Sequence, residues 1–207
     1  MTETGKKPTL GRKIFIASAL SLVLIGLPAV SWLYLRDGLN WRKEALKELG
    51  SYGQIPQATI HWGDGTMEDR LNGKVVVAHL FGDNADLTAD NRKIVDTGQQ
   101  LFDQFGSNLN FRITMIAASP TAEFRSYTQK MPSYDFATWV WIPGHGNWPT
   151  VLKNGFESYY VRNKISAYPH YYALTDTSGV IRRFYNAMDE KEVGRMVEQI
   201  AILLPQQ

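Results

Sequence analysis

The side chains best suited to chemistry lie in a polar loop that follows an apolar run of the sequence. Residues 75–81 (VVVAHLF) are apolar apart from one histidine, and the run stops at Gly82. The polar residues that follow are Asp83, Asn84, Asp86, Thr88 and Asp90. Carboxylates at such a strand–loop–helix junction can bind a cation, move a proton, or stabilise the start of the helix. The chain contains no cysteine, so thiol catalysis, disulfides and cysteine-ligated metal sites are excluded.

Metal binding is one chemistry that this loop could support. Imidazole and carboxylate ligands suit Cu(II) and Zn, and the candidate ligands are His170, Asp83 and Asp86. His79 lies within the apolar run, and we interpret it as a core histidine rather than a ligand. Cu(I) prefers sulfur, but the sulfurs expected near the core are those of Met115, Met131 and Met188, which lie outside the loop. The sequence therefore favours a chain without a cofactor, with copper as an alternative.

The loop also has a purely structural interpretation. The spacing of its aspartates does not match a calcium-binding loop, and no G-x-S-x-G motif indicates a hydrolase. Asp86 and Asp90 can stabilise the dipole of the predicted helix, and Thr88 or Asp90 can cap it. We therefore predict that the loop serves the fold and that the chain is not an enzyme.

An aromatic segment, residues 139–149 (WVWIPGHGNWP), is the most unusual composition in the chain. It can be read as a loop packed on the domain by its own aromatic side chains. It can also be read as a docking surface, because aromatic anchors dominate protein interfaces. We favour docking, with Trp139, Trp141, His145 and Trp148 as partner-binding residues. Tyrosines that could extend such a surface are Tyr159, Tyr160, Tyr168, Tyr171 and Tyr172.

The elements that must position these residues alternate between strand and helix. Apolar runs and turn signals predict strands at 59–62, 75–81, 110–117, 139–142, 171–175 and 180–185. Helical spacing and capping residues predict helices from about Thr88 to Gly106, then at 121–130, 150–160 and 188–204. Such an order, with a βαβ half followed by a ββα half, is typical of a thioredoxin-like fold, an α/β class with a central mixed sheet flanked by helices.

The N-terminal region predicts a membrane anchor. Residues 14–35 carry no charge and exceed the roughly 20 residues that a helix needs to cross a bilayer. The basic residues before this segment are Lys6, Lys7, Arg12 and Lys13. They place residues 1–13 in the cytoplasm and the domain on the periplasmic or outer side of the cytoplasmic membrane. A cleaved signal peptide fits less well, since its apolar stretch is normally shorter. Residues 36–52 then form a juxtamembrane helix or linker, and residues 53–207 the domain.

Several motifs, taken in order, resemble the Sco (SenC) family across about residues 53–204. Gly73 and Lys74 resemble the turn before its first core strand, and Phe81 with Gly82 the step that ends this strand. Residues 118–120 (ASP) and 174–179 (LTDTSG) resemble a later strand end and a hairpin turn. The resemblance implies a membrane-anchored thioredoxin-fold protein of a family that handles copper and thiols during cytochrome c oxidase assembly.

The resemblance breaks where the family's chemistry is located. Residues 84–89 occupy the place of the family's C-P-D-x-C-P loop, with the aspartate retained at Asp86. Asn84 and Thr88 stand at the positions of its two cysteines. The family's copper-binding histidine corresponds to Tyr168, and His170 lies two residues farther on. The loop formed by Asn84, Asp86 and Thr88 is thus interpreted as a degenerate active site.

The sequence therefore predicts a non-catalytic binding or assembly factor for a respiratory oxidase or another membrane complex. A permanent accessory subunit of such a complex is one alternative, and a copper chaperone with histidine and aspartate ligands is another. The formal net charge is +2, without a basic stripe interleaved with aromatic residues, so nucleic-acid binding is not expected.

Overall fold

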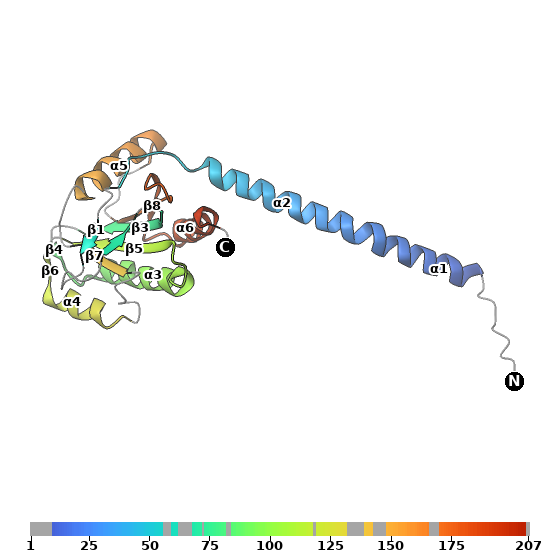
Figure 1. Cartoon of the computed structure of the whole chain (residues 1–207), viewed down its shortest axis with the longest axis horizontal. Coiled ribbons are helices and arrows are strands. Elements are labelled where there is room, and N and C mark those ends of the chain that lie inside the picture. The colour runs from blue at the N-terminus through green and yellow to red at the C-terminus, as the bar shows by residue number, and fades with distance from the viewer. Residues whose placement is uncertain are drawn as a thin grey trace. The chain divides into compact units, whose positions relative to one another are not determined.

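The computed structural model describes residues 10–55, 59–61, 68–71, 73–81, 84–117, 119–131, 139–142, 148–165 and 170–205 (Figure 1). The chain divides into two compact units, Met1–Lys47 and Glu48–Gln207. Of the residues considered above, Asp83, His145 and Tyr168 lie outside the described part, as do residues 1–9. The backbones of Asn84, Trp139 and Trp141 are described, but their side chains are not.

The described part of the first unit, residues 10–47, is one uninterrupted helix. It consists of α1 (Leu10–Ser21), a π-helical turn (Leu22–Gly26) and α2 (Leu27–Lys47). Pro28 cannot donate a backbone hydrogen bond, and its ring crowds the carbonyl of Leu24 inside the wider π turn, which fits this placement. The part from Ser18 to Lys47 is long and apolar enough to cross a membrane, as the sequence predicts. At about 1.5 Å per residue, this part is longer than a bilayer core of roughly 30 Å.

The second unit is built on a five-stranded mixed sheet. Its strands are β3 (Val75–Leu80), β5 (Phe111–Ile116), β7 (Trp139–Ile142), β8 (Tyr171–Thr175) and β9 (Ile181–Asn186). They lie in the order β7-β5-β3-β8-β9. β5 runs parallel to β3 and β7, whereas β8 is antiparallel to β3 and β9. The order and directions confirm the predicted thioredoxin-like arrangement.

Helices cover both faces of this sheet. Their bounds are α3 (Ala89–Phe105), α4 (Ala122–Gln129), α5 (Trp148–Asn163) and α6 (Glu190–Leu203). Side chains of α3, α4 and α6 pack in one apolar cluster with Val75 and Val77, whereas those of α5 pack in a second cluster with Val76 and Ala78. Successive residues of a strand point to opposite faces, so the continuous apolar run of β3 fills both clusters.

Short strands complete the unit. β1 (Thr59–His61) pairs with β2 (Glu68–Arg70) in an antiparallel ribbon, and β4 (Asn84–Ala85) pairs in parallel with β6 (Ser119–Pro120). β2, β4 and β6 are not predicted from the sequence. β2 reads Glu-Asp-Arg and lacks an apolar alternation, while β4 and β6 are too short to produce a pattern.

The β8–β9 hairpin turn is organised by Asp176, within the segment that resembles the Sco hairpin. Asp176 Oδ1 accepts hydrogen bonds from the backbone nitrogens of Ser178 and Val180, each at 3.0 Å. Its Oδ2 accepts one from Arg182 Nε at 2.7 Å. Gly179 has a φ of 81°, a conformation that favours glycine. The motif thus closes the hairpin.

The chain just after the N-terminal helix is bound to the domain. Residues 50–55 run along β9 and its turn, with backbone hydrogen bonds from Gly50 N to Arg182 O (2.8 Å) and from Ile181 N to Gly53 O (2.9 Å). Glu48 precedes them and accepts hydrogen bonds from Arg183 on β9 and from Arg195 (2.7 Å) and Gln199 (3.1 Å) on α6. The compact unit therefore includes residues 48–52, which are predicted from the sequence as part of the linker. The prediction differs because long-range hydrogen bonds of this kind leave no local sequence signal.

Replacing Glu48 tests this connection. The hydrogen bond from Arg195, with the nearby charge of Arg183, lowers the pKa of Glu48 below its ordinary value of 4.5. Glu48→Gln should therefore cost about 1–2 kcal/mol of unfolding free energy at pH 7, since Arg183 and Arg195 lose a charged partner. Chemical denaturation of the full chain measures this loss. The loss should shrink as the pH falls below 4.5, because the Glu48 carboxylate then binds a proton when the chain unfolds.

The matched control for this variant is Glu44→Gln. The ion pair of Glu44 with Lys47 is solvent-exposed and long, at 4.0 Å, so replacement of Glu44 should leave stability nearly unchanged. Equal denaturation midpoints for the two variants would contradict the role given to Glu48.

Candidate functional site

The polar loop lies at the ends of the parallel strands. β3 ends at Leu80, and Phe81 N donates to Ile116 O at the end of β5 (2.8 Å). β4 then pairs with β6, so the loop runs beside Ser119 and Pro120, where Thr121 N donates to Ala85 O (3.0 Å). In open α/β sheets, ligands commonly bind outside the carboxyl ends of the strands. The loop therefore occupies the expected place for a site.

Thr88 and Asp86 shape the start of α3. Thr88 Oγ1 accepts a hydrogen bond from Asn91 N (3.1 Å), which confirms Thr88 as the N-cap. The Asn91 side chain donates to the backbone oxygen of Asp86 (2.8 Å), and Thr88 N donates to the same atom (2.9 Å). The side chains of Asp86, Thr88 and Asp90 are exposed. These contacts cap α3 and fix the backbone of its first turn.

His170 lies beside the start of α3, where it is paired with Asp90. Its Nε2 lies 3.6 Å from Asp90 Oδ2, and the histidine side chain is partly exposed. The co-ligands predicted from the sequence are Asp86 and Asp83, of which Asp83 lies outside the described residues, whereas Asp90 is predicted only as a helix-capping residue. The pair arises because α3 begins next to the start of β8, a proximity that no local pattern encodes.

His79 lies beneath this surface and is 1% exposed. Its Nδ1 is 2.6 Å from the carbonyl oxygen of Tyr171, so Nδ1 carries the proton and donates, while Nε2 has no hydrogen-bond partner in the described structure. The rings of Phe81 and Tyr172 pack against it, with centroids at 4.6 and 5.5 Å. Burial lowers the pKa of His79 to about 4, with a contribution from the charge of His170. The prediction of a core histidine is confirmed.

The donors near the loop do not fit Cu(I). That ion prefers thiolate or thioether ligands, whereas the chain has no cysteine and its core methionines, Met115, Met131 and Met188, pack in the apolar cluster under α3 and α6. Within the described residues, histidine, aspartate and glutamate nowhere gather in a group of three that could hold a metal ion.

The aromatic docking surface requires a correction at Trp148. This residue begins α5, is 1% exposed and packs in the cluster beneath that helix, so its side chain is not available to a partner. Tyr159, Tyr171 and Tyr172 are also buried, and Tyr172 OH donates to Ile94 O (2.5 Å). Aromatic density is high in cores and in interfaces alike, so composition alone could not separate the two. Trp139 and Trp141 belong to β7, an edge strand of the five-stranded sheet.

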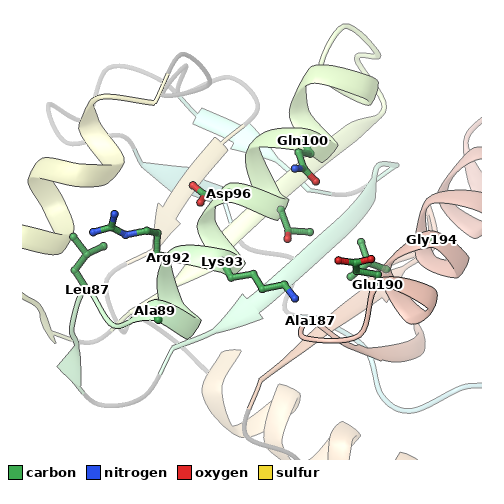
Figure 2. A pocket seen from close by; sticks show the side chains of 11 residues that line it. Leu87, Ala89, Arg92, Lys93, Asp96, Gln100, Ala187, Glu190 and Gly194 are labelled. Atoms are coloured by element: carbon green, nitrogen blue, oxygen red, sulfur yellow. The ribbon is translucent and has the colours of Figure 1, made fainter.

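A pocket of about 850 Å³ lies beside the loop, between α3 and the start of α6 (Figure 2). Its lining residues are Leu87, Ala89, Arg92, Lys93, Asp96, Thr97, Gln100, Ala187, Glu190, Val193 and Gly194. Lys93 extends towards α6, where its Nζ donates to Met188 O (3.1 Å). Asp96 accepts a hydrogen bond from Tyr127 OH (2.5 Å), and the Arg92 guanidinium lies over the Tyr127 ring. No pattern in the sequence indicates this pocket, because charged residues on a helix usually mark a solvated face.

Known structures share the fold. A SCO1/SenC family lipoprotein from Bacillus anthracis str. Ames matches with a TM-score of 0.52 and 14% identity, covering 73% of this chain and 95% of its own. A putative thiol:disulfide interchange protein DsbE from Chlorobium tepidum matches with 0.51 and 14%, covering 75% and 99%. BsSco, of the Sco family of cytochrome c oxidase assembly proteins, matches with 0.50 and 14%, covering 72% and 92%.

These similarities establish a thioredoxin-like fold with Sco and thiol:disulfide proteins among its structural relatives. Neither a protein-family model nor the sequence of a curated protein matches the chain. The fold class and the structural resemblance to the Sco family are thus confirmed, in a chain without cysteine.

Burial of His79 predicts an acid-sensitive fold. Below pH 6.5 the unfolded chain binds a proton at this residue, while the folded chain binds none until about pH 4. Stability should therefore fall as the pH drops through this window, by about 3 kcal/mol from this group. His79→Gln cannot bind the proton, and its amide can still donate to Tyr171 O. Urea denaturation of both full-length chains from pH 7 to 4 should show the difference, and parallel pH profiles would contradict it.

Proposed function

We propose that this chain is a membrane-anchored binding or assembly factor without thiol chemistry, acting on a membrane protein complex, with a respiratory oxidase as the first candidate. The proposal rests on the loop of Asn84, Asp86 and Thr88, which has an ordered backbone but no cysteine. It has a defined strand end, the β4–β6 pairing and a capped helix start, and the sequence resemblance to the Sco family implies that Asn84 and Thr88 occupy the positions of that family's cysteines. A loop with this backbone structure but without reactive side chains favours a binding function over a catalytic one.

The chemistry of the site favours the same conclusion. Thiol–disulfide exchange needs a thiolate, and the Thr88 hydroxyl oxygen that stands in its place accepts a hydrogen bond as a helix cap. Asp90 and His170 form an acid–base pair at the surface, but an acid–base pair alone does not make a nucleophilic site. We therefore infer a non-enzymatic role. The copper-chaperone alternative has the poor donor set against it.

We place the chain in the cytoplasmic membrane as a single-pass protein. The apolar helix supports anchoring, and the basic residues before it support a cytoplasmic N-terminus with the domain on the periplasmic or outer side. The partner-binding residues proposed on the domain are Trp139, Trp141 and His145, without Trp148.

Purification of the tagged full-length chain from native membranes in mild detergent tests this function. We expect enrichment of partly assembled forms of one membrane complex, below equal stoichiometry. The double variant Trp139→Ala/Trp141→Ala should reduce this enrichment by about tenfold, the effect of losing interface anchors. The control is Leu109→Ala, which removes an exposed apolar side chain elsewhere, and thermal unfolding shows whether each variant is folded.

Other outcomes decide against the proposal. A fixed one-to-one ratio with a mature complex indicates the accessory subunit instead. Metal retained by the purified full-length chain after dialysis, and lost in His170→Ala, indicates the copper-chaperone alternative. The proposal fails if no membrane complex is enriched.

Restoring the two cysteines tests the alignment of the loop with the Sco family. Asn84→Cys/Thr88→Cys should form an intramolecular disulfide on mild oxidation, so that two titratable thiols fall to nearly none while the chain stays monomeric. The control pair is Asn84→Cys/Gln100→Cys, in which the second position lies about 18 Å farther along α3. Persistence of both thiols in the first pair, or their equal loss in both pairs, would contradict the alignment.

A further inference from the structure

The helix that carries the apolar segment extends well past it. Charge-free residues end at Leu35, whereas α2 continues without a break to Lys47 (Figure 1). Residues 36–47 therefore add about 18 Å of helix along the same axis. A helix that continues a membrane span in this way cannot turn to lie flat on the bilayer surface.

Leucines remain exposed on this extension. Leu39 is 59% exposed and Leu46 is 45% exposed, although both lie outside the charge-free segment. Spacings of four and seven residues place Leu35, Leu39 and Leu46 on one face of the helix. Lipid headgroups add only roughly 5–7 Å beyond each side of the bilayer core and can cover Leu39. Leu46 lies about 16 Å beyond Leu35, so lipid cannot cover it even if the helix is strongly tilted.

Charged side chains of opposite sign lie on opposite faces of this part of the helix. At about 100° per residue, Arg42 lies on the same face as Leu39 and Leu46 and between them along the helix axis. Asp37 and Glu44 lie on the opposite face. Two copies of this chain in one membrane would be parallel, so their Arg42 side chains would meet at the shared seam. Like charges in that position disfavour a second copy as the partner.

We propose that Leu39, Arg42 and Leu46 form a docking stripe for a helix of another membrane protein that also extends beyond the bilayer. Charge complementarity assigns that helix an apolar stripe with an aspartate or glutamate opposite Arg42. The inference rests on the proposed function, because it assumes a membrane-bound partner, and it identifies the part of the chain that would contact it.

The absence of cysteine allows a direct test by single-cysteine labelling. Leu39→Cys and Leu46→Cys probe the stripe, and Glu44→Cys on the opposite face is the matched control. Each full-length variant is labelled with a charged maleimide in native membranes and in liposomes that contain only the purified chain. We expect labelling of Leu46→Cys to be about tenfold slower in native membranes than in liposomes, and Glu44→Cys to react equally in both. Leu39→Cys, which lipid can already cover in both preparations, should show a smaller difference. In the Leu46→Cys chain, Arg42→Glu should restore fast labelling, whereas Arg42→Lys should not.

Three results would overturn the inference. One is equal labelling of Leu46→Cys in native membranes and in liposomes, because lipid or the chain itself would then provide any protection. The second is a disulfide-linked dimer of Leu46→Cys, which would identify a second copy as the occupant. The third is persistence of protection in Arg42→Glu. Co-purification of a membrane complex in any of these cases would leave the proposed function standing without the docking stripe.

Discussion

Burial of β3 on both faces is the constraint on which the domain depends. The strand pairs with β5 on one side and β8 on the other, and its successive side chains fill two separate clusters beneath different helices. Everything near the candidate site is fixed relative to this strand. The loop leaves from its end, His79 lies on it, and Tyr172 pairs with His79 while donating to Ile94 of α3. A change in the register of β3 would turn each of these side chains to the other face.

The same constraint explains why the loop can keep its shape without reactive groups. The start of α3 is held by a cap at Thr88, by the hydrogen bond from Asn91 to Asp86 O, and by packing of Ile94 and Val95 in the core. None of these interactions needs a thiol or a metal. The start of α3 in this thioredoxin-like fold therefore does not depend on a thiol or a metal for its shape, since fold and function are separable.

Local patterns predicted the elements well, and tertiary contacts explain the rest. The apolar run of β3, the Thr88 cap and the β8–β9 turn follow from residues close together in sequence, so each could be predicted. Burial of Trp148 and the pairing of Asp90 with His170 depend on residues far apart in sequence. The connection of Glu48 to β9 and α6 is of the same kind. Composition describes which side chains are present, but the packing of α5 and α6 on the sheet decides which of them face solvent.

The proposed function is that this domain acts by binding, without chemistry at the loop of Asn84, Asp86 and Thr88. The most direct measurement is the assembly state of membrane complexes, resolved by native electrophoresis, in cells that lack the chain and in cells that carry its variants. The account predicts that one complex accumulates as a partial assembly when the chain is absent. It also predicts that the wild-type chain and His170→Ala/Asp90→Asn restore that complex equally, because the loop contributes no chemistry. Restoration by the wild-type chain but not by the double variant, or no change in any complex, would contradict it.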